Sequence, residues 1–168
     1  LRAHLPDLRE ALAAERALGS ARRAELEALM ESLARTPALD VEAAYVELFD
    51  RGRSTSLHLF EHVHGDSRDR GPAMIDLAQT YEKAGLYLAP HELPDYLPVV
   101  LEYASTQPPR EARAFLAEMV HILQAIFSAL QQRGSAYASV LGALVELAGE
   151  KAHAVKVVAD EPIDDSWA

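Results

Sequence analysis

The residues best suited to chemistry lie between Tyr45 and Gly71, where the composition differs from the rest of the chain. The 27 positions of this stretch hold nine charged residues and three histidines, and bulky apolar side chains alternate with them. Such a set could support acid–base or nucleophilic catalysis, metal coordination, or charged recognition of a partner. Each of these functions requires its own spacing of side chains, so the spacing must decide among them.

Metal coordination is the first function that the histidines suggest. His58 and His62 are four residues apart, which would place both on one face of a helix, and His64 follows closely. A metal-dependent enzyme built on these three residues is therefore one hypothesis. The intervening residues do not form an HExxH motif, and the sequence favours the alternative that the histidines make hydrogen bonds within a polar interface.

A carboxylate-bridged di-metal centre is a second metal hypothesis, because Glu-x-x-His occurs three times, at Glu61/His64, Glu118/His121 and Glu150/His153. That class needs such pairs on facing helices, all directed inward. At about 100° per residue, His121 falls about 160° from Met119, which lies on the apolar stripe of the same helix. The Glu150 pair is likewise turned away from the apolar face of the last helix. Two pairs therefore point to solvent, and one pair cannot build the centre.

Nucleophilic and phosphate chemistry have weaker signals. The serines near the histidines have no strand-to-helix elbow to present them. The segment from Arg51 to Thr55 combines two guanidinium groups and two hydroxyls at an expected helix start, which are ingredients of a phosphate site, but it lacks the spacing of a P-loop. Phosphate or nucleotide binding stays open beside the alternative of a charged loop whose arginines pair with Asp50, Asp66 or Asp69.

Composition narrows the class of partner. The 168 residues are 25% charged and 49% hydrophobic, as in ordinary globular proteins, and they include no cysteine, which excludes disulfides and thiolate chemistry. The net charge of −10 argues against nucleic acid and anionic membrane surfaces as partners and suits a basic peptide. We expect no membrane insertion, because no uncharged apolar run reaches the roughly 18 residues needed to span a bilayer. With no signal peptide visible, we expect a cytoplasmic protein, although the start at Leu1 leaves room for a short segment before it.

The elements that must position these residues are predicted to be helices throughout, because apolar residues recur at i, i+3, i+4 and i+7. A first helix is expected to end at Gly19, a second before Pro37, and a third is capped by Asp40 and buries Val41, Tyr45, Leu48 and Phe49. Ser54 to His62 is predicted to form another helical piece.

Further helices are predicted in the second half of the chain. One starts near Pro72 and ends at Gly85, and the next follows Glu92-Leu-Pro-Asp-Tyr-Leu-Pro98. The strongest amphipathic pattern runs from Arg110 to Gln132, and Ser135 caps the last helix. The sequence therefore predicts an all-α fold, a single bundle-like domain of about seven or eight helices over residues 1–159, with an acidic mobile tail at 160–168.

Three stretches carry a family resemblance: Tyr45–Gly71, the Ala-Met-Ile-Asp-Leu that begins at Ala73, and Gly85–Tyr103. Together they resemble the nitrate reductase assembly chaperones of the NarJ type, within the wider TorD-like family of redox-enzyme maturation chaperones. The wider family's Pro-Asp-x-His signature is matched by Pro94 and Asp95, with Tyr96-Leu97 where a histidine would be sought. The similarity is specific from about Val41 to Tyr103 and looser elsewhere.

The resemblance implies a non-catalytic, cytoplasmic, all-helical chaperone without a cofactor of its own. Its implied partner is the apo catalytic (alpha) subunit of respiratory nitrate reductase, bound largely through the N-terminal peptide. The chaperone would support molybdenum cofactor insertion before membrane docking, so any contact with the cofactor would be indirect. The alternatives are direct binding of the molybdenum cofactor or a guanine nucleotide, or service to another molybdoenzyme of the same family.

On this basis we predict a peptide-binding surface formed by the central stretch and the Glu92–Pro98 segment. Phe49, Phe60 and Tyr81 are the expected apolar anchors, and the acids are expected to pair with basic residues of the peptide. The candidate residues are Phe49, Asp50, Arg53, His58, Phe60, Glu61, His62, His64, Asp66, Arg68, Asp69, Arg70, Tyr81 and Asp95.

Overall fold

The computed structural model describes residues 2–65 and 67–156, and it is helical over this part of the chain. Its α-helices are α1 (Leu5–Ala14), α2 (Ser20–Arg35), α3 (Ala38–Tyr45), α4 (Arg70–Lys83), α5 (Leu97–Thr106), α6 (Pro109–Glu118), α7 (Val120–Gln132) and α8 (Ala138–Leu147). Short 3₁₀ turns occur at Arg2–His4, Arg53–Thr55 and Leu59–Glu61, and one π-helical turn covers Val46–Asp50. The predicted all-α class is confirmed, and the predicted acidic tail lies outside the described residues.

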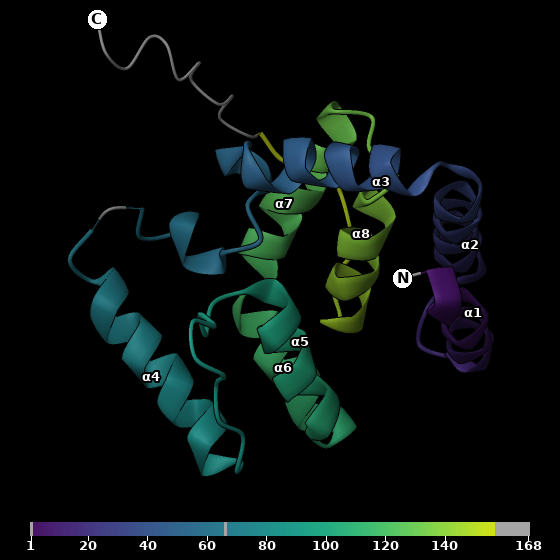
Figure 1. Cartoon of the computed structure of the whole chain (residues 1–168). Coiled ribbons are helices and arrows are strands. Elements are labelled where there is room, and N and C mark those ends of the chain that lie inside the picture. Colours follow the sequence, from purple (N-terminus) through teal and green to yellow (C-terminus); the bar gives the residue numbers. More distant parts are fainter. Residues whose placement is uncertain (1, 66, 157–168) are drawn as a thin grey trace, which may run out of the picture.

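The helices are arranged around α7 and α8, which pack against each other at the centre of the molecule. The α1–α2 hairpin packs beside α8, and α3 crosses α7 and α8 at one end (Figure 1). The α5–α6 pair covers the other end, and α4 lies at the periphery. This arrangement leaves α3 facing the α1–α2 hairpin across the start of α8.

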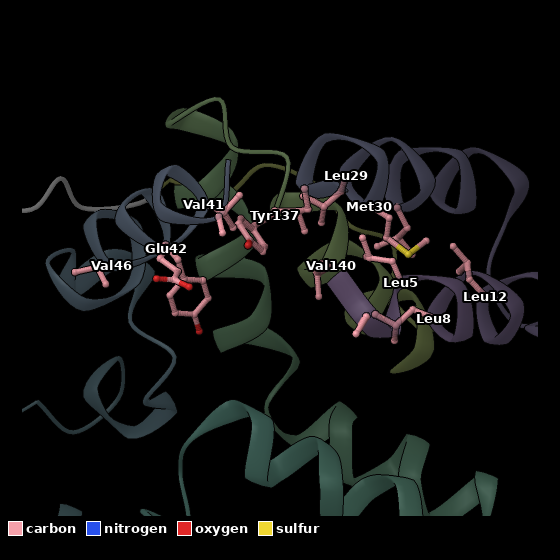
Figure 2. A pocket seen from close by; sticks show the side chains of 15 residues that line it. Leu5, Leu8, Leu12, Leu29, Met30, Val41, Glu42, Val46, Tyr137 and Val140 are labelled. Atoms are coloured by element: carbon pink, nitrogen blue, oxygen red, sulfur yellow. The ribbon is translucent and has the colours of Figure 1, made fainter. Parts of the chain in front are cut away.

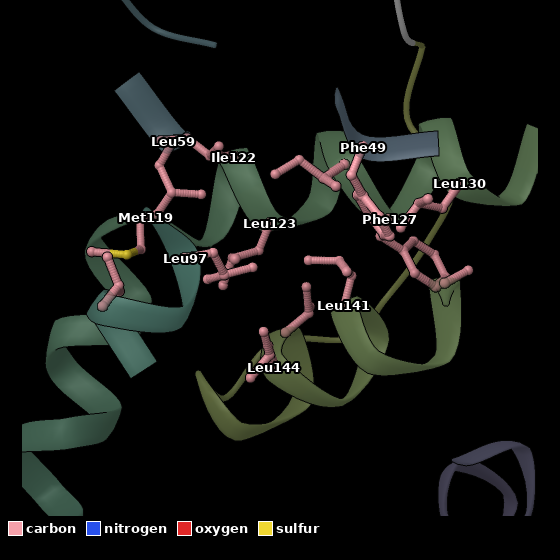
Figure 3. Packing of buried hydrophobic residues seen from close by; sticks show 14 residues of the cluster. Phe49, Leu59, Leu97, Met119, Ile122, Leu123, Phe127, Leu130, Leu141 and Leu144 are labelled. Atoms are coloured by element: carbon pink, nitrogen blue, oxygen red, sulfur yellow. The ribbon is translucent and has the colours of Figure 1, made fainter. Parts of the chain in front are cut away.

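The hydrophobic core follows from the apolar stripes of α7 and α8 (Figure 3). Leu123, Ile126 and Leu130 of α7 are fully buried, and they meet Leu141 and Leu144 of α8. Other elements complete the cluster with Leu97, Val100, Phe49 and Leu59. Because protein interiors are close-packed, we expect truncation of any of these large side chains to alanine to cost about 2–5 kcal/mol.

The segment from Arg110 to Gln132, predicted as one helix, is two helices with a bend of 68°. The break lies at Met119, whose φ of −109° and ψ of 11° leave the α-helical ladder, and its amide donates to the Leu116 carbonyl in a tighter turn. The bend lets both apolar faces reach the core from different directions. No single described helix is long and apolar enough to cross a bilayer, and the bent pair α6 and α7 meets that criterion only when its two parts are taken together.

The ends of several helices follow the sequence signals. Gly85 and Gly134 have φ of +80° and +64°, and in each case the following amide donates to the carbonyl five residues earlier. This is the Schellman arrangement, which glycine permits because it has no Cβ. The predicted ends of α4 and α7 are therefore confirmed. Ser135, predicted to cap the last helix, does not cap it: the N-cap of α8 is Tyr137, and Ser135 Oγ accepts from the Tyr137 amide in the turn before the helix.

Three other predictions about helix ends were wrong. Gly19 does not end the first helix, which stops at Ala14, but precedes α2 as its N-cap. Asp40 lies within the first turn of α3, after Pro37 at the N-cap. Glu150 and His153 lie beyond α8 in an extended segment, where a helical wheel does not apply, although both side chains are exposed as expected.

Arg22 joins the α1–α2 hairpin to the central pair. Its Nε lies 3.0 Å from a carboxylate oxygen of Glu146 on α8, and its guanidinium carbon lies 5.7 Å from the centre of the Phe127 ring. The guanidinium also lies so close to Gly142 that a Cβ there would overlap it. A glycine at this point of α8 therefore leaves room for the Arg22 guanidinium.

We expect Leu123→Ala to lower the free energy of unfolding by about 2–5 kcal/mol, because the side chain is fully buried and its removal leaves a cavity. Leu39→Ala is the matched control, since Leu39 is 78% exposed and its truncation should change stability by no more than about 0.5 kcal/mol. Urea unfolding followed by circular dichroism measures both. Equal stabilities of the two variants would contradict the assignment of the core.

Candidate functional site

The segment from Ser54 to His62, predicted as a helix, instead forms two short turns around an extended residue. His58 pairs with Tyr96 as an isolated antiparallel bridge. The Leu97 amide donates to the Leu57 carbonyl at 2.8 Å, and the Leu59 amide donates to the Asp95 carbonyl at 3.0 Å. These long-range backbone hydrogen bonds replace the helical ladder, so His58 and His62 do not share a helical face.

Asp95 is the centre of this arrangement, and its side chain is fully buried. Its Oδ2 accepts from the Phe60 amide at 3.1 Å and lies 3.7 Å from Nη2 of Arg70. Its Oδ1 lies 3.5 Å from Nδ1 of His58, and these two buried atoms have no nearer polar partner among the described residues. A buried carboxylate is costly unless it is paired and hydrogen-bonded, so Asp95 requires all three neighbours.

The neighbours of Asp95 are tied to one another. Nη2 of Arg70 also lies 3.6 Å from Oε1 of Glu61, whose other oxygen accepts from Ser56 Oγ at 2.6 Å. The His62 ring lies 2.8 Å from the Ser56 carbonyl through Nε2, while the His64 ring packs edge-on against Phe60. The three histidine rings thus have different partners. Within the described residues no three His, Asp or Glu side chains are placed to share a metal ion.

The predicted site residues divide by accessibility. Phe49, Tyr81 and Asp95 are buried, and the Tyr81 hydroxyl donates to the Pro94 carbonyl at 2.8 Å. The half-buried residues are His58, Phe60, Glu61, His62, His64 and Arg70; the exposed ones are Asp50, Arg53, Arg68 and Asp69. Asp66 lies outside the described residues. The three buried residues support this surface from inside, and contact of the others with a peptide stays a prediction.

In the arginine-rich segment from Arg51 to Thr55, the Thr55 hydroxyl has a structural role. Thr55 is fully buried, and its Oγ1 donates to the Leu48 carbonyl and lies 3.3 Å from the Gly52 carbonyl. Arg51 pairs with Glu47 at 2.9 Å. The hydroxyl of Thr55 therefore closes the π-helical turn and is not available to a phosphate.

An apolar groove of about 1130 Å³ lies elsewhere in the molecule. Figure 2 shows side chains of α1 and α2 on one side, those of α3 and the π-helical turn on the other, and Tyr137 and Val140 between them. The lining residues are Ala3, Leu5, Leu8, Leu12, Leu26, Leu29, Met30, Leu33, Ala38, Val41, Glu42, Tyr45, Val46, Tyr137 and Val140. Glu42 is the one charged side chain among these described residues.

Aromatic rings separate the groove from the core. Tyr45 and Tyr137 line the groove, and both rings pack against Phe49 of the core, with ring centres 4.7 Å and 5.3 Å away. Burial raises the pKa of both phenols above the ordinary value, and for Tyr45 a hydrogen bond with Tyr96 raises the pKa further. Tyr45 thus joins the groove to the segment that carries Asp95.

Sequence reasoning missed the groove because it assigned these apolar positions to helix faces buried in the core. Leu8 and Val46 remain 44% and 43% exposed. The sequence did contain a signal, because three successive helices, α1 to α3, each carry an apolar stripe. In the structure α1 buries only Leu5, and α3 buries none of its residues fully. More apolar surface is present than the core uses.

Fold and site together define an all-helical protein with an apolar groove supported by a buried ion-pair network. The chain matches the family model described as nitrate reductase delta subunit over residues 15–142, and it belongs to this family.

Its relatives are named as assembly chaperones. It is 45% identical to the nitrate reductase molybdenum cofactor assembly chaperone NarJ of Escherichia coli (strain K12) over 166 residues, which are 97% of this chain and 70% of that protein. It is 46% identical to the probable chaperone NarW of the same strain over 138 residues, 80% of this chain and 60% of that one. A probable NarJ of Bacillus subtilis (strain 168) is 34% identical over 101 residues, 60% of this chain and 55% of that protein. These names agree with the prediction that the protein is a chaperone and not an enzyme.

Replacement of Asp95 tests the buried network. We expect Asp95→Ala to lower the free energy of unfolding by about 3–5 kcal/mol, because Arg70 loses its buried partner and the Phe60 amide loses its acceptor. Asp95→Asn keeps an acceptor for that amide and should cost less. Chemical unfolding measures the difference, and an alanine variant as stable as wild type would exclude a structural role for Asp95.

The Tyr81 hydroxyl provides a pH-dependent test. Burial, with smaller contributions from Asp95 and Tyr103, raises its pKa in the folded protein. As the pH rises above about 10, the unfolded chain therefore loses this proton first, and the free energy of unfolding should fall. We expect Tyr81→Phe to be about 1–3 kcal/mol less stable at neutral pH, because the Pro94 carbonyl loses its donor, and to lose stability less steeply between pH 9 and 11. Parallel curves for the two proteins would contradict this.

Proposed function

We propose that the protein is a dedicated chaperone of respiratory nitrate reductase, which binds the apo catalytic subunit in the cytoplasm before membrane docking. Family membership and the names of the relatives support the client class. The proposal assigns no cofactor to the chaperone itself. Its part in molybdenum cofactor insertion is to keep the client subunit competent to receive that cofactor.

The observation that carries the proposal is the apolar groove. Two helices on one side and a third on the other form a trough, whose lining includes one carboxylate and aliphatic side chains from α1, α2, α3, the π-helical turn and α8. An amphipathic helix fits such a trough, because residues at i, i+3, i+4 and i+7 present one continuous apolar stripe. We therefore assign the N-terminal peptide of the catalytic subunit to this groove, as a helix with its apolar face inward.

The sequence suggested that the central stretch from Tyr45 to Gly71 binds the peptide directly. In this proposal its buried residues instead support the groove from behind. Its buried residues fix the backbone behind the groove, through Tyr96 and its contacts with Tyr45 and His58. Its exposed charges, which include Asp50, Arg68 and Asp69, remain available for basic and acidic residues of the client outside the helix. The groove then holds the apolar face of the client helix, and the charged surface of the central stretch pairs with charged residues of the client.

Calorimetric titration with a synthetic N-terminal peptide of the catalytic subunit tests this assignment. We expect Leu8→Glu and Val46→Glu each to weaken binding by at least tenfold, because both side chains line the groove and a carboxylate buried against an apolar helix face loses its hydration.

The matched control is Ile75→Glu. Ile75 is an apolar residue that is 59% exposed on α4 and does not line the groove, so the same charge is introduced elsewhere and affinity should stay within a factor of two. Circular dichroism checks that all three variants are folded. Equal weakening by all three variants would remove the groove as the binding site, and no binding by wild type would overturn the proposed function.

A further inference from the structure

A second, smaller cavity of about 300 Å³ lies between the C-terminal end of α4 and the first turns of α5. It is lined by Tyr81, Leu86, Tyr87, Leu88, Ala89, Glu92, Val99, Glu102 and Tyr103. None of these residues lines the apolar groove. Its lining also differs in chemistry from that of the groove, because tyrosine rings and carboxylates occur together in it.

Aromatic rings form much of the wall. The Tyr81 and Tyr103 rings lie 4.9 Å apart, and Phe115 packs edge-on against Tyr103 at 4.8 Å, which fixes the position of that ring. The Tyr81 hydroxyl is already bonded to the Pro94 carbonyl. Tyr87 is 79% exposed, which is unusual for a side chain with so much apolar area. A ligand that covers the Tyr87 ring therefore gains contact area without displacing existing packing.

Two carboxylates accompany the rings. The Glu92 Oε2 accepts from the Ala89 amide at 2.9 Å, so this carboxylate is held in place by the loop. Glu102 projects from α5 into the same lining. No Lys, Arg or His is among the described residues that line the cavity, so the charges in its lining are those of the two carboxylates.

We propose that this cavity binds an arginine side chain of a partner polypeptide. A guanidinium group is planar, stacks on aromatic faces and donates hydrogen bonds to carboxylates, and the cavity offers both kinds of contact together. The aliphatic stem of the arginine would pack against Leu86, Leu88 and Val99. The negative charge of the whole chain favours the approach of such a basic segment.

The cavity needs both features to select arginine. Carboxylates alone on a surface bind cations weakly because water screens them, and rings alone accept any apolar group. A guanidinium placed between rings and carboxylates satisfies both, whereas a neutral side chain of the same shape leaves the carboxylates unpaired. Discrimination between arginine and a neutral isostere is therefore the property to measure.

The experiment is a nuclear magnetic resonance titration of the ¹⁵N-labelled full chain with N-acetyl-arginine methylamide. The corresponding citrulline derivative has nearly the same shape without the charge. We expect saturable shifts for the arginine derivative at amides of residues 86–92 and 99–103, and at least fivefold weaker binding of the citrulline derivative. Similar binding of the two derivatives, or shifts located elsewhere, would overturn the proposal.

Variants identify the groups responsible. Glu92→Gln with Glu102→Gln removes both charges while the glutamine oxygen at position 92 can still accept from Ala89, and we expect at least tenfold weaker binding of the arginine derivative. Tyr87→Leu keeps an apolar side chain without the aromatic face and should weaken binding about threefold or more. The charge-matched control, Glu10→Gln with Glu31→Gln on α1 and α2, should bind as wild type. Unchanged binding by the Glu92/Glu102 variant would refute the assignment.

Discussion

The buried carboxylate of Asp95 is the interaction on which the middle of the molecule depends. A charge with no exposed surface is tolerated only when its partners are in place, and its partners come from separate segments: the Phe60 amide and the His58 ring from the central stretch, and Arg70 from the first turn of α4. These segments must therefore assemble together around the residue that precedes α5. Part of the mixture of charged and apolar residues between Tyr45 and Gly71 follows from this requirement, because His58 and Arg70 contact the buried acid while Leu59 enters the core.

The same network reaches the apolar groove through Tyr96. The backbone of Tyr96 pairs with His58, its ring packs against the His58 ring at 5.1 Å, and its hydroxyl group interacts with Tyr45 on the groove wall. Thr55 completes the connection from the other side by closing the π-helical turn that follows α3. The position of α3, and with it one wall of the groove, is thus held by polar contacts behind that wall together with the packing of Phe49 in the core.

Periodicity predicted those features that depend on local chain chemistry. The helix α4 and the glycine ends at Gly85 and Gly134 need only the neighbouring residues to specify them, and they were predicted correctly. The Ser54–His62 segment was predicted wrongly because its Leu57 carbonyl and its Leu59 and Phe60 amides bond to Leu97 and Asp95, which lie far along the chain and which no local pattern reports. The bend at Met119 was missed because the apolar stripe continues through it. The groove was missed because a helical stripe looks the same whether it faces a core or a cavity that a partner can fill.

The two cavities differ in what they can recognise. An apolar groove with one carboxylate in its lining binds a helix by burying apolar surface. The affinity gained in this way depends little on whether leucine or isoleucine occupies the groove. Such a groove alone would accept many amphipathic helices. A pocket with tyrosine rings and two carboxylates favours an arginine side chain, because a neutral side chain would leave the carboxylates unpaired. If a client engages both, the groove supplies most of the affinity and the arginine pocket fixes the register. Two sites of moderate affinity on one chain strengthen binding only while the client occupies both of them. A chaperone built this way can distinguish its client from other helices and still release it, because neither site binds tightly alone.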